Sequence, residues 1–171
     1  MLLGLSLLYV GAVLIMNGLW LLDKVSDREI VFINLFTGFV TLCVALYSSF
    51  GPGADASSIK GAALTLLFSA TYLWVAFNRI FNADGRGLGW FCLFVAITAV
   101  PVAVQTLGGA NNGSAIWLGI NWALWAVLWF TFFLLLALRL PIGRQTGYLC
   151  LAIGVATAWL PGFLMLSGQM T

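Results

Sequence analysis

Six long apolar stretches, separated by short polar breaks, most constrain what this chain can fold into. A transmembrane helix needs about 20 mostly apolar residues to cross the hydrocarbon core of a bilayer. The stretches are longer than tilted membrane strands and do not alternate strictly between apolar and polar residues, which favours helices over a barrel. They predict a single all-α integral membrane domain over residues 1–171, with spans near 2–22, 30–50, 61–81, 87–107, 115–138 and 146–167.

The composition excludes most other classes of protein. Hydrophobic residues make up 63% of the chain and charged residues only 7%, against about 45–50% and 25% in soluble domains. A net charge of +2 without a basic cluster does not fit a nucleic-acid partner. The chain has no histidine, and Cys43, Cys92 and Cys150 stand singly in apolar stretches. We therefore expect no catalytic residues, no metal site, no cofactor and no enzymatic activity.

The basic residues predict the orientation in the membrane. Only Lys60 falls on the side of the second and fourth connections. The other six basic residues fall in or beside the first, third and fifth connections: Lys24, Arg28, Arg79, Arg86, Arg139 and Arg144. Cytoplasmic loops carry an excess of Lys and Arg. Both termini are therefore expected on the non-cytoplasmic side of the membrane.

Polar residues inside the spans are neutral, and the charged residues stay near the span ends. A charge at the bilayer centre costs at least about 2.5–3.5 kcal/mol and usually marks an ion path or a proton relay. The neutral groups include Asn17, Thr71, Asn78 and Asn121. They fit the lining of a path for a neutral, hydrogen-bonding solute, although such residues also hold helices together.

Three tryptophans form a stripe on the fifth span. Trp122, Trp125 and Trp129 stand at i, i+3 and i+7, so they share one helical face. Flat indoles lining a narrow path would sandwich a planar solute, and their N–H groups would offer donors. The alternative is a bulky packing ridge, which would make the chain a structural or accessory membrane subunit without a pore and with a Trp-rich oligomer contact.

The first and third spans carry comparable stripes. Phe68, Thr71 and Tyr72 share a face of the third span, and Val10 and Leu14 share a face of the first. The first span also has a row of glycines beside this face, Gly4, Gly11 and Gly18. Such small residues permit the close approach of another backbone. The pattern favours three helical hairpins, each giving its first helix to a shared lumen. Pro101 and Pro161 each free a carbonyl that needs another partner.

Motifs along nearly the whole chain resemble the AmiS/UreI family of bacterial acid-amide transporters and urea channels. The resemblance lies in 3–11 (LGLSLLYVG), 66–68 (LLF), 71–73 (TYL) with Asn78, 93–98 (LFVAIT) with Pro101, Trp122 with 125–129 (WAVLW), and 157–159 (TAW) with Pro161.

The resemblance implies one pore in each protomer, a homo-hexameric ring, and passive conduction of urea or short amides. Coupling to a cytoplasmic amidase or urease would fit it. By motif match, Phe68, Tyr72, Trp125 and Trp129 would form the cytoplasmic-side filter. The outer constriction would be lined by Val10, Leu14 and Trp122.

Two departures from the acid-gated members favour the amide-transporter branch or an ungated urea channel. Those members have a long outer loop rich in His and carboxylates, whereas the connection here is short, from about Gly51 to Lys60, and has no His. They also carry a glutamate just before the glycine that matches Gly154, where this chain has Ile153. Because a gate near pH 6 requires a group that titrates there, we expect no proton gating.

Overall fold

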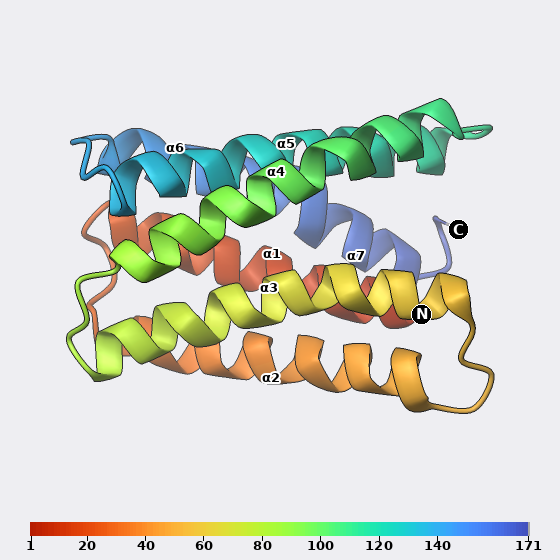
Figure 1. Cartoon of the computed structure of the whole chain (residues 1–171), viewed down its shortest axis with the longest axis horizontal. Helices are drawn as coiled ribbons and strands as arrows, with labels where there is room; N and C mark the ends of the chain where they lie inside the picture. Colours follow the sequence, from red (N-terminus) through yellow and green to blue (C-terminus); the bar gives the residue numbers. More distant parts are fainter. Residues whose placement is uncertain (171) are drawn as a thin grey trace.

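The computed structural model describes residues 1–170, in which the regular structure is helical throughout. Six segments of this part of the chain are long and apolar enough to cross a membrane. Five are single α-helices and the sixth is built from three consecutive pieces (Figure 1). The elements are α1 (Leu2–Leu21), α2 (Glu29–Phe50), α3 (Ala56–Ile80), α4 (Arg86–Gly108), α5 (Gly113–Leu136), α6 (Gly143–Ile153), the π-helical η1 (Gly154–Trp159) and α7 (Leu160–Leu166).

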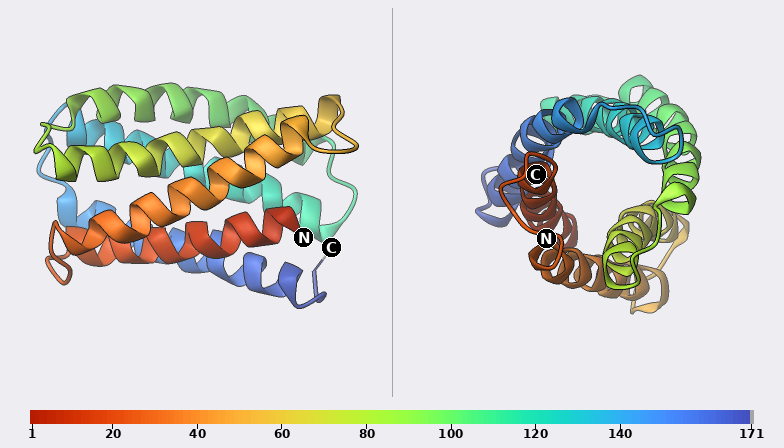
Figure 2. Two further views of the ribbon diagram at one scale, coloured as in Figure 1. Left: turned by 90° about the horizontal axis from the view of Figure 1, so that it is seen from below. Right: turned by 90° about the vertical axis from the view of Figure 1, so that its left-hand side faces the viewer.

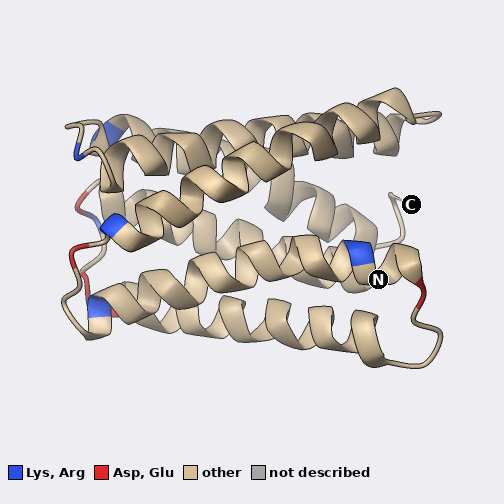
Figure 3. Ribbon diagram, viewed as in Figure 1, with Lys and Arg blue, Asp and Glu red and all other residues tan. Residues whose placement is uncertain are grey.

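The spans follow one another around a ring, which α6, η1 and α7 close against α1 (Figure 2). The expectation of an all-α protein with six membrane-spanning helices is confirmed. Both termini lie at the same end of the ring as the α2–α3 and α4–α5 connections (Figure 1). We call this the Lys60 end and the opposite end, where the other basic residues gather, the Arg79 end (Figure 3).

The most extensive packing is not between the two helices of each expected hairpin. It is between the second helix of one hairpin and the first helix of the next. The closest partners are α2 with α3, α4 with α5, and α1 with α6, η1 and α7. Small residues explain the last contact. A Cβ atom on Gly11 would lie 2.4 Å from the backbone nitrogen of Trp159, and one on Gly162 would lie 2.5 Å from that of Leu8. The predicted close-approach row on α1 is thus where the ring closes.

Helix α3 begins at Ala56, five residues earlier than the span expected from hydropathy. Asp55 caps it: its carboxylate accepts from the Ser58 backbone N–H at 2.7 Å, and the Ser58 hydroxyl accepts from the Asp55 backbone N–H at 2.9 Å. This reciprocal capping box stabilises a polar first turn that hydropathy assigns to a loop. Lys60 is therefore a helical residue, and the connection ends at Asp55.

Candidate transport pathway

Three cavities lie in series between the ends of the ring, lined mainly by α1, α3 and α5. The one at the Lys60 end has a volume of about 290 Å³. The central cavity and the one at the Arg79 end measure about 30 Å³ each. The first two share Phe68 and Trp125 as lining residues, and the last two share Val75, Leu88 and Phe132.

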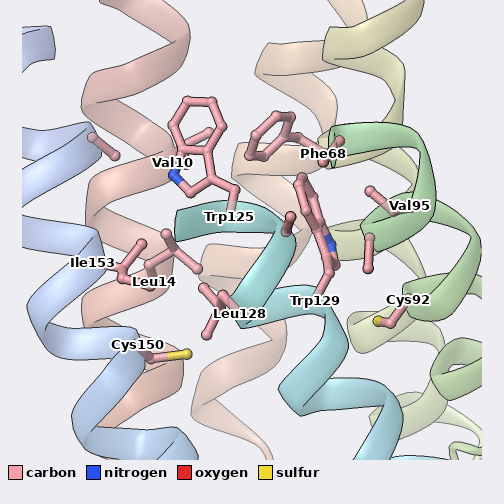
Figure 4. Packing of buried hydrophobic residues seen from close by; sticks show 14 of the residues in the cluster. Val10, Leu14, Phe68, Cys92, Val95, Trp125, Leu128, Trp129, Cys150 and Ile153 are labelled. Atoms are coloured by element: carbon pink, nitrogen blue, oxygen red, sulfur yellow. The ribbon is translucent and has the colours of Figure 1, made fainter. Parts of the chain in front are cut away.

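Phe68 lies at the centre of an aromatic cluster that separates the first two cavities (Figure 4). Its ring centroid is 4.9 Å from that of Trp125, at near-perpendicular planes, and 4.7 Å from that of Trp129. Trp122 meets Phe68 at 5.9 Å and Trp125 at 5.1 Å, both edge to face. Tyr72 lies 6.5 Å from Phe68. The structure thus brings the predicted filter residues together and turns the Trp stripe inward.

Two threonines fix the orientation of the inner indoles. The Trp125 N–H donates to Thr157 Oγ1 at 2.8 Å, and the Trp129 N–H donates to Thr71 Oγ1 at 3.3 Å. Each threonine hydroxyl in turn donates to the carbonyl four residues earlier, at 2.6 Å and 2.7 Å. The expectation that these indoles offer free donors to a solute is therefore wrong for both, because their N–H groups already have partners.

Asn121 satisfies the backbone where a proline interrupts the sixth span. In an α-helix the carbonyl of Thr157 would accept from the N–H of residue 161, which is proline and has none. The Asn121 side-chain amide donates to this carbonyl at 3.0 Å. The π-helical turn at Gly154–Trp159 ends two residues before Pro161. Asn121 lines none of the three cavities; it supports Thr157, which orients Trp125.

The other predicted pathway residues are distributed along the three cavities. Val10 and Trp122 line the large cavity, whereas Leu14, one turn further along α1, lines the central one. Thr71 and Asn17 also line the central cavity, and Asn17 exchanges side-chain hydrogen bonds of 2.8 and 3.2 Å with Asn34. Asn78 lines the cavity at the Arg79 end.

Several lining residues escaped sequence reasoning. In the central cavity these are Val75, Leu88, Cys92, Leu128 and Phe132. They are apolar residues in apolar spans, so no sequence signal distinguished them from lipid-facing ones. The large cavity is also lined by Ser6, whose buried hydroxyl has no partner within residues 1–170. Tyr72 also lines the central cavity.

The two ends differ in their polar contacts. At the Lys60 end, the Lys60 ammonium donates to Gln105 Oε1 at 3.1 Å. At the Arg79 end, the Trp20 N–H donates to Asp27 at 2.6 Å, and the Arg79 guanidinium lies 5.3 Å from the Trp20 ring centroid. Arg79 also pairs with Asp27 at 3.6 Å. These three side chains join the α1–α2 connection to the last turn of α3.

Two carboxyl groups with lowered pKa values lie at the ends of the ring, outside the three cavities. The backbone N–H of Ser58 lowers the pKa of Asp55, and the backbone N–H and side chain of Arg86 lower the pKa of Asp84. Neither residue lines one of the three cavities. Residues 1–170 contain no cluster of His, Cys, Asp or Glu suited to a metal ion.

Comparison with known proteins identifies the family. The model of the AmiS/UreI family of transporters matches residues 2–169. The chain belongs to the AmiS/UreI family. It is 43% identical to a Mycolicibacterium smegmatis protein named as an amidate substrates transporter, over 97% of this chain and 77% of that protein. It is 36% identical to the acid-activated urea channel of Helicobacter pylori, over 95% of this chain and 96% of that one.

Solved structures agree with this assignment. The cryo-EM structure of the Helicobacter pylori urea channel in its closed state matches with a TM-score of 0.87 at 36% identity, over 99% of this chain and all of that chain. The crystal structure of the urea channel from that organism matches with a TM-score of 0.86 at 37% identity, over the full length of both. This AmiS/UreI member is accordingly a multi-pass membrane channel or transporter and not an enzyme.

Proposed function

We propose that the chain is a passive channel for small, neutral, planar solutes, namely short aliphatic amides or urea, and that acid does not activate it. One observation carries the proposal: three cavities lie in series, and the first two meet at inward-facing aromatic side chains. The names of its relatives mention amidate substrates and urea, and both urea and neutral carboxamides are planar and uncharged.

The central cavity suits such a solute energetically. Removing an amide from water without a replacement hydrogen bond costs roughly 2–7 kcal/mol. The rings of Phe68 and Trp129 would contact the flat face of the solute, and the Tyr72 hydroxyl would bond to its edge. A compact, strongly hydrated ion such as sodium would receive far too little in return. The central cavity of about 30 Å³ has room for little more than a water molecule. Passage of an amide therefore requires the surrounding side chains to move apart, and selection depends on width and flatness rather than on tight binding.

The alternative, a subunit without a pore, loses its main support. It required the Trp stripe to lie on an outer contact surface. Trp122, Trp125 and Trp129 are only 7%, 3% and 6% exposed within a single chain, so they have little surface to offer a neighbour. Protein that leaves the permeability of liposomes at the lipid-only value for every amide tested would restore that alternative.

Replacement of Trp129 tests the filter. In stopped-flow light scattering of proteoliposomes, Trp129→Ala should change the urea-to-acetamide permeability ratio, because it removes one wall of the cluster. Trp129→Phe keeps an aromatic wall and loses only the bond to Thr71, so its ratio should lie closer to the wild type. Trp117→Ala, at a residue outside the three cavities, is the matched control. A ratio unchanged by Trp129→Ala would remove this residue from the filter.

The absence of acid activation has its own test. The chain has no histidine, the side chain whose ordinary titration spans pH 5 to 8. Urea and acetamide fluxes should therefore be nearly constant over that range. A steep rise in flux on acidification would overturn this part of the proposal.

We further propose a homo-hexamer in a bacterial inner membrane with both termini on the non-cytoplasmic side, supplying a cytoplasmic amidase or urease. The orientation follows from the six basic residues at the Arg79 end (Figure 3). A reporter fused to the C-terminus that is active only in the cytoplasm would contradict it. Mass determination in detergent or nanodiscs would test the hexamer.

A further inference from the structure

Two charged side chains line the three cavities within the described residues, and both are cationic. They are Lys60 in the large cavity and Arg79 at the other end, and no carboxylate of residues 1–170 lines any of the three. A solute that passes from end to end therefore meets a positive charge first and last, with an uncharged aromatic cluster between them.

The charge of Lys60 is not neutralised, whereas that of Arg79 is. Arg79 pairs with Asp27 at 3.6 Å. Lys60 bonds to the neutral amide oxygen of Gln105, and no acidic side chain of residues 1–170 lies within 4 Å of its ammonium. The carboxylate of Asp55, which precedes α3 at this end, accepts from the N–H of Ser58. The large cavity thus carries a net positive charge.

The aromatic cluster alone would favour the wrong solutes. Tryptophan faces attract cations, and guanidinium is held especially well because it is planar and weakly hydrated. Guanidinium also has nearly the shape of urea, so a filter based on width and flatness would not reject it. Such a cation would bind among Phe68, Trp125 and Trp129 and obstruct neutral solutes.

We infer that Lys60 is a specificity-determining residue that keeps planar cations such as guanidinium and amidinium ions from the aromatic cluster. The inference rests on the proposed channel function. A cavity lined by one sign of charge, with low-dielectric walls, focuses the field and changes local ion concentrations by about tenfold or more. The Lys60 ammonium excludes cations in this way and leaves the concentration of uncharged amides unchanged.

Competition by guanidinium tests this role. Urea or acetamide flux is measured in proteoliposomes at low ionic strength with millimolar guanidinium chloride, against sodium chloride at equal concentration. Lys60→Gln should make the flux, expressed relative to the same variant's flux without guanidinium, about tenfold more sensitive to guanidinium. Lys60→Arg should behave as the wild type, because it keeps the charge. The difference should shrink at high salt, where the charge is screened.

Gln105→Ala is the matched control, because it removes the hydrogen-bond partner of Lys60 and keeps the positive charge. It should stay insensitive to guanidinium. Equal sensitivity of the wild type and Lys60→Gln would overturn the inference, as would equal sensitivity of Lys60→Arg and Lys60→Gln. If the flux through Gln105→Ala became as sensitive to guanidinium as that through Lys60→Gln, the effect would depend on geometry instead of charge. That result would also overturn the inference. Wild-type protein with no urea or acetamide flux would refute the proposed function itself, and the inference with it.

Discussion

Each end of the pathway is lined by one basic side chain, but only the one at the Arg79 end is paired with an acidic residue. At the Lys60 end, a cation borders a cavity of about 290 Å³ and bonds only to a neutral amide. At the Arg79 end, a cation borders a cavity of about 30 Å³ and is joined to Trp20 and Asp27. The first arrangement is wide and charged, and the second is narrow and neutralised. Charge selection and steric restriction are thus separated along one path.

The contacts of Trp20 explain why the Arg79 end is narrow. Its indole N–H bonds to a carboxylate at 2.6 Å, and Arg79 covers its ring. Hydrogen bonds to charged groups are stronger than neutral ones. Trp20 lines the last cavity, so one wall of this end is a side chain held by two partners.

Removal of Trp20 should produce the largest difference between the ends. If each passage requires the Trp20–Asp27 bond to break, at a cost of about 1.5 kcal/mol, Trp20→Ala should raise acetamide flux by up to about tenfold. It should also admit longer amides such as butyramide. Leu64→Ala, which enlarges the already wide cavity at the Lys60 end, should leave the flux unchanged. Both variants are measured by stopped-flow light scattering.

Trp74→Ala controls for the loss of an indole near the Arg79 end. Trp74 packs against Phe91 at 5.6 Å and lines none of the three cavities. A larger flux in Trp74→Ala than in Trp20→Ala, or equal increases in Trp20→Ala and Leu64→Ala, would contradict the view that only one end is restrictive.

Neutralising Asp27 should have a smaller effect of the same sign. Asp27→Asn keeps an oxygen that can accept from Trp20 but loses the charge that pairs with Arg79. Exposed ion pairs contribute little, about 0.2–1 kcal/mol, so we expect an increase in flux of about twofold. Asp23→Asn, in the same connection and without an ion pair in the described residues, should not change the flux. A decrease in Asp27→Asn would show that the pair holds the path open.

Features set by local sequence were predictable. The six spans follow from runs of apolar residues, and the lining faces of α1, α3 and α5 follow from helical spacing. The stripe of Trp122, Trp125 and Trp129 indeed turns inward. These properties depend on neighbours within one helix, which the sequence displays directly.

Features that depend on contacts between helices were not predictable. The N–H groups of Trp125 and Trp129 have partners because Thr157 and Thr71 approach from other spans. Asn121 looked like a lumen residue, yet it supports the carbonyl that Pro161 leaves free. Asp27 and Arg79 hold Trp20 in place beside the last cavity. Side-chain hydrogen bonds between distant segments leave no periodic signal in the sequence.

Replacement of Asp84 should have the smallest effect of these variants. It tests whether a loss of stability at the Arg79 end is enough to change solute flux. This carboxylate accepts from the backbone N–H and the guanidinium of Arg86, lies 3.5 Å from Arg139, and lines none of the three cavities. Its contacts with Arg86 lower the pKa of Asp84. A carboxyl group whose pKa is lower in the folded state stabilises that state above its unfolded pKa of about 3.9 and loses this contribution as the pH falls through the folded value.

Asp84→Asn should therefore lower the Tm slightly at pH 7, and the difference from the wild type should vanish as the pH falls through the lowered pKa of the folded state. Thermal melts in detergent over a series of pH values from 7 downward, followed by tryptophan fluorescence, measure it. Solute flux should stay unchanged, because this ion pair lies at the Arg79 end but not beside the path. An increase in flux comparable to that of Asp27→Asn would mean that any loosening of the connections at this end opens the path. The restriction would then belong to the whole end of the ring instead of to Trp20 and its two partners.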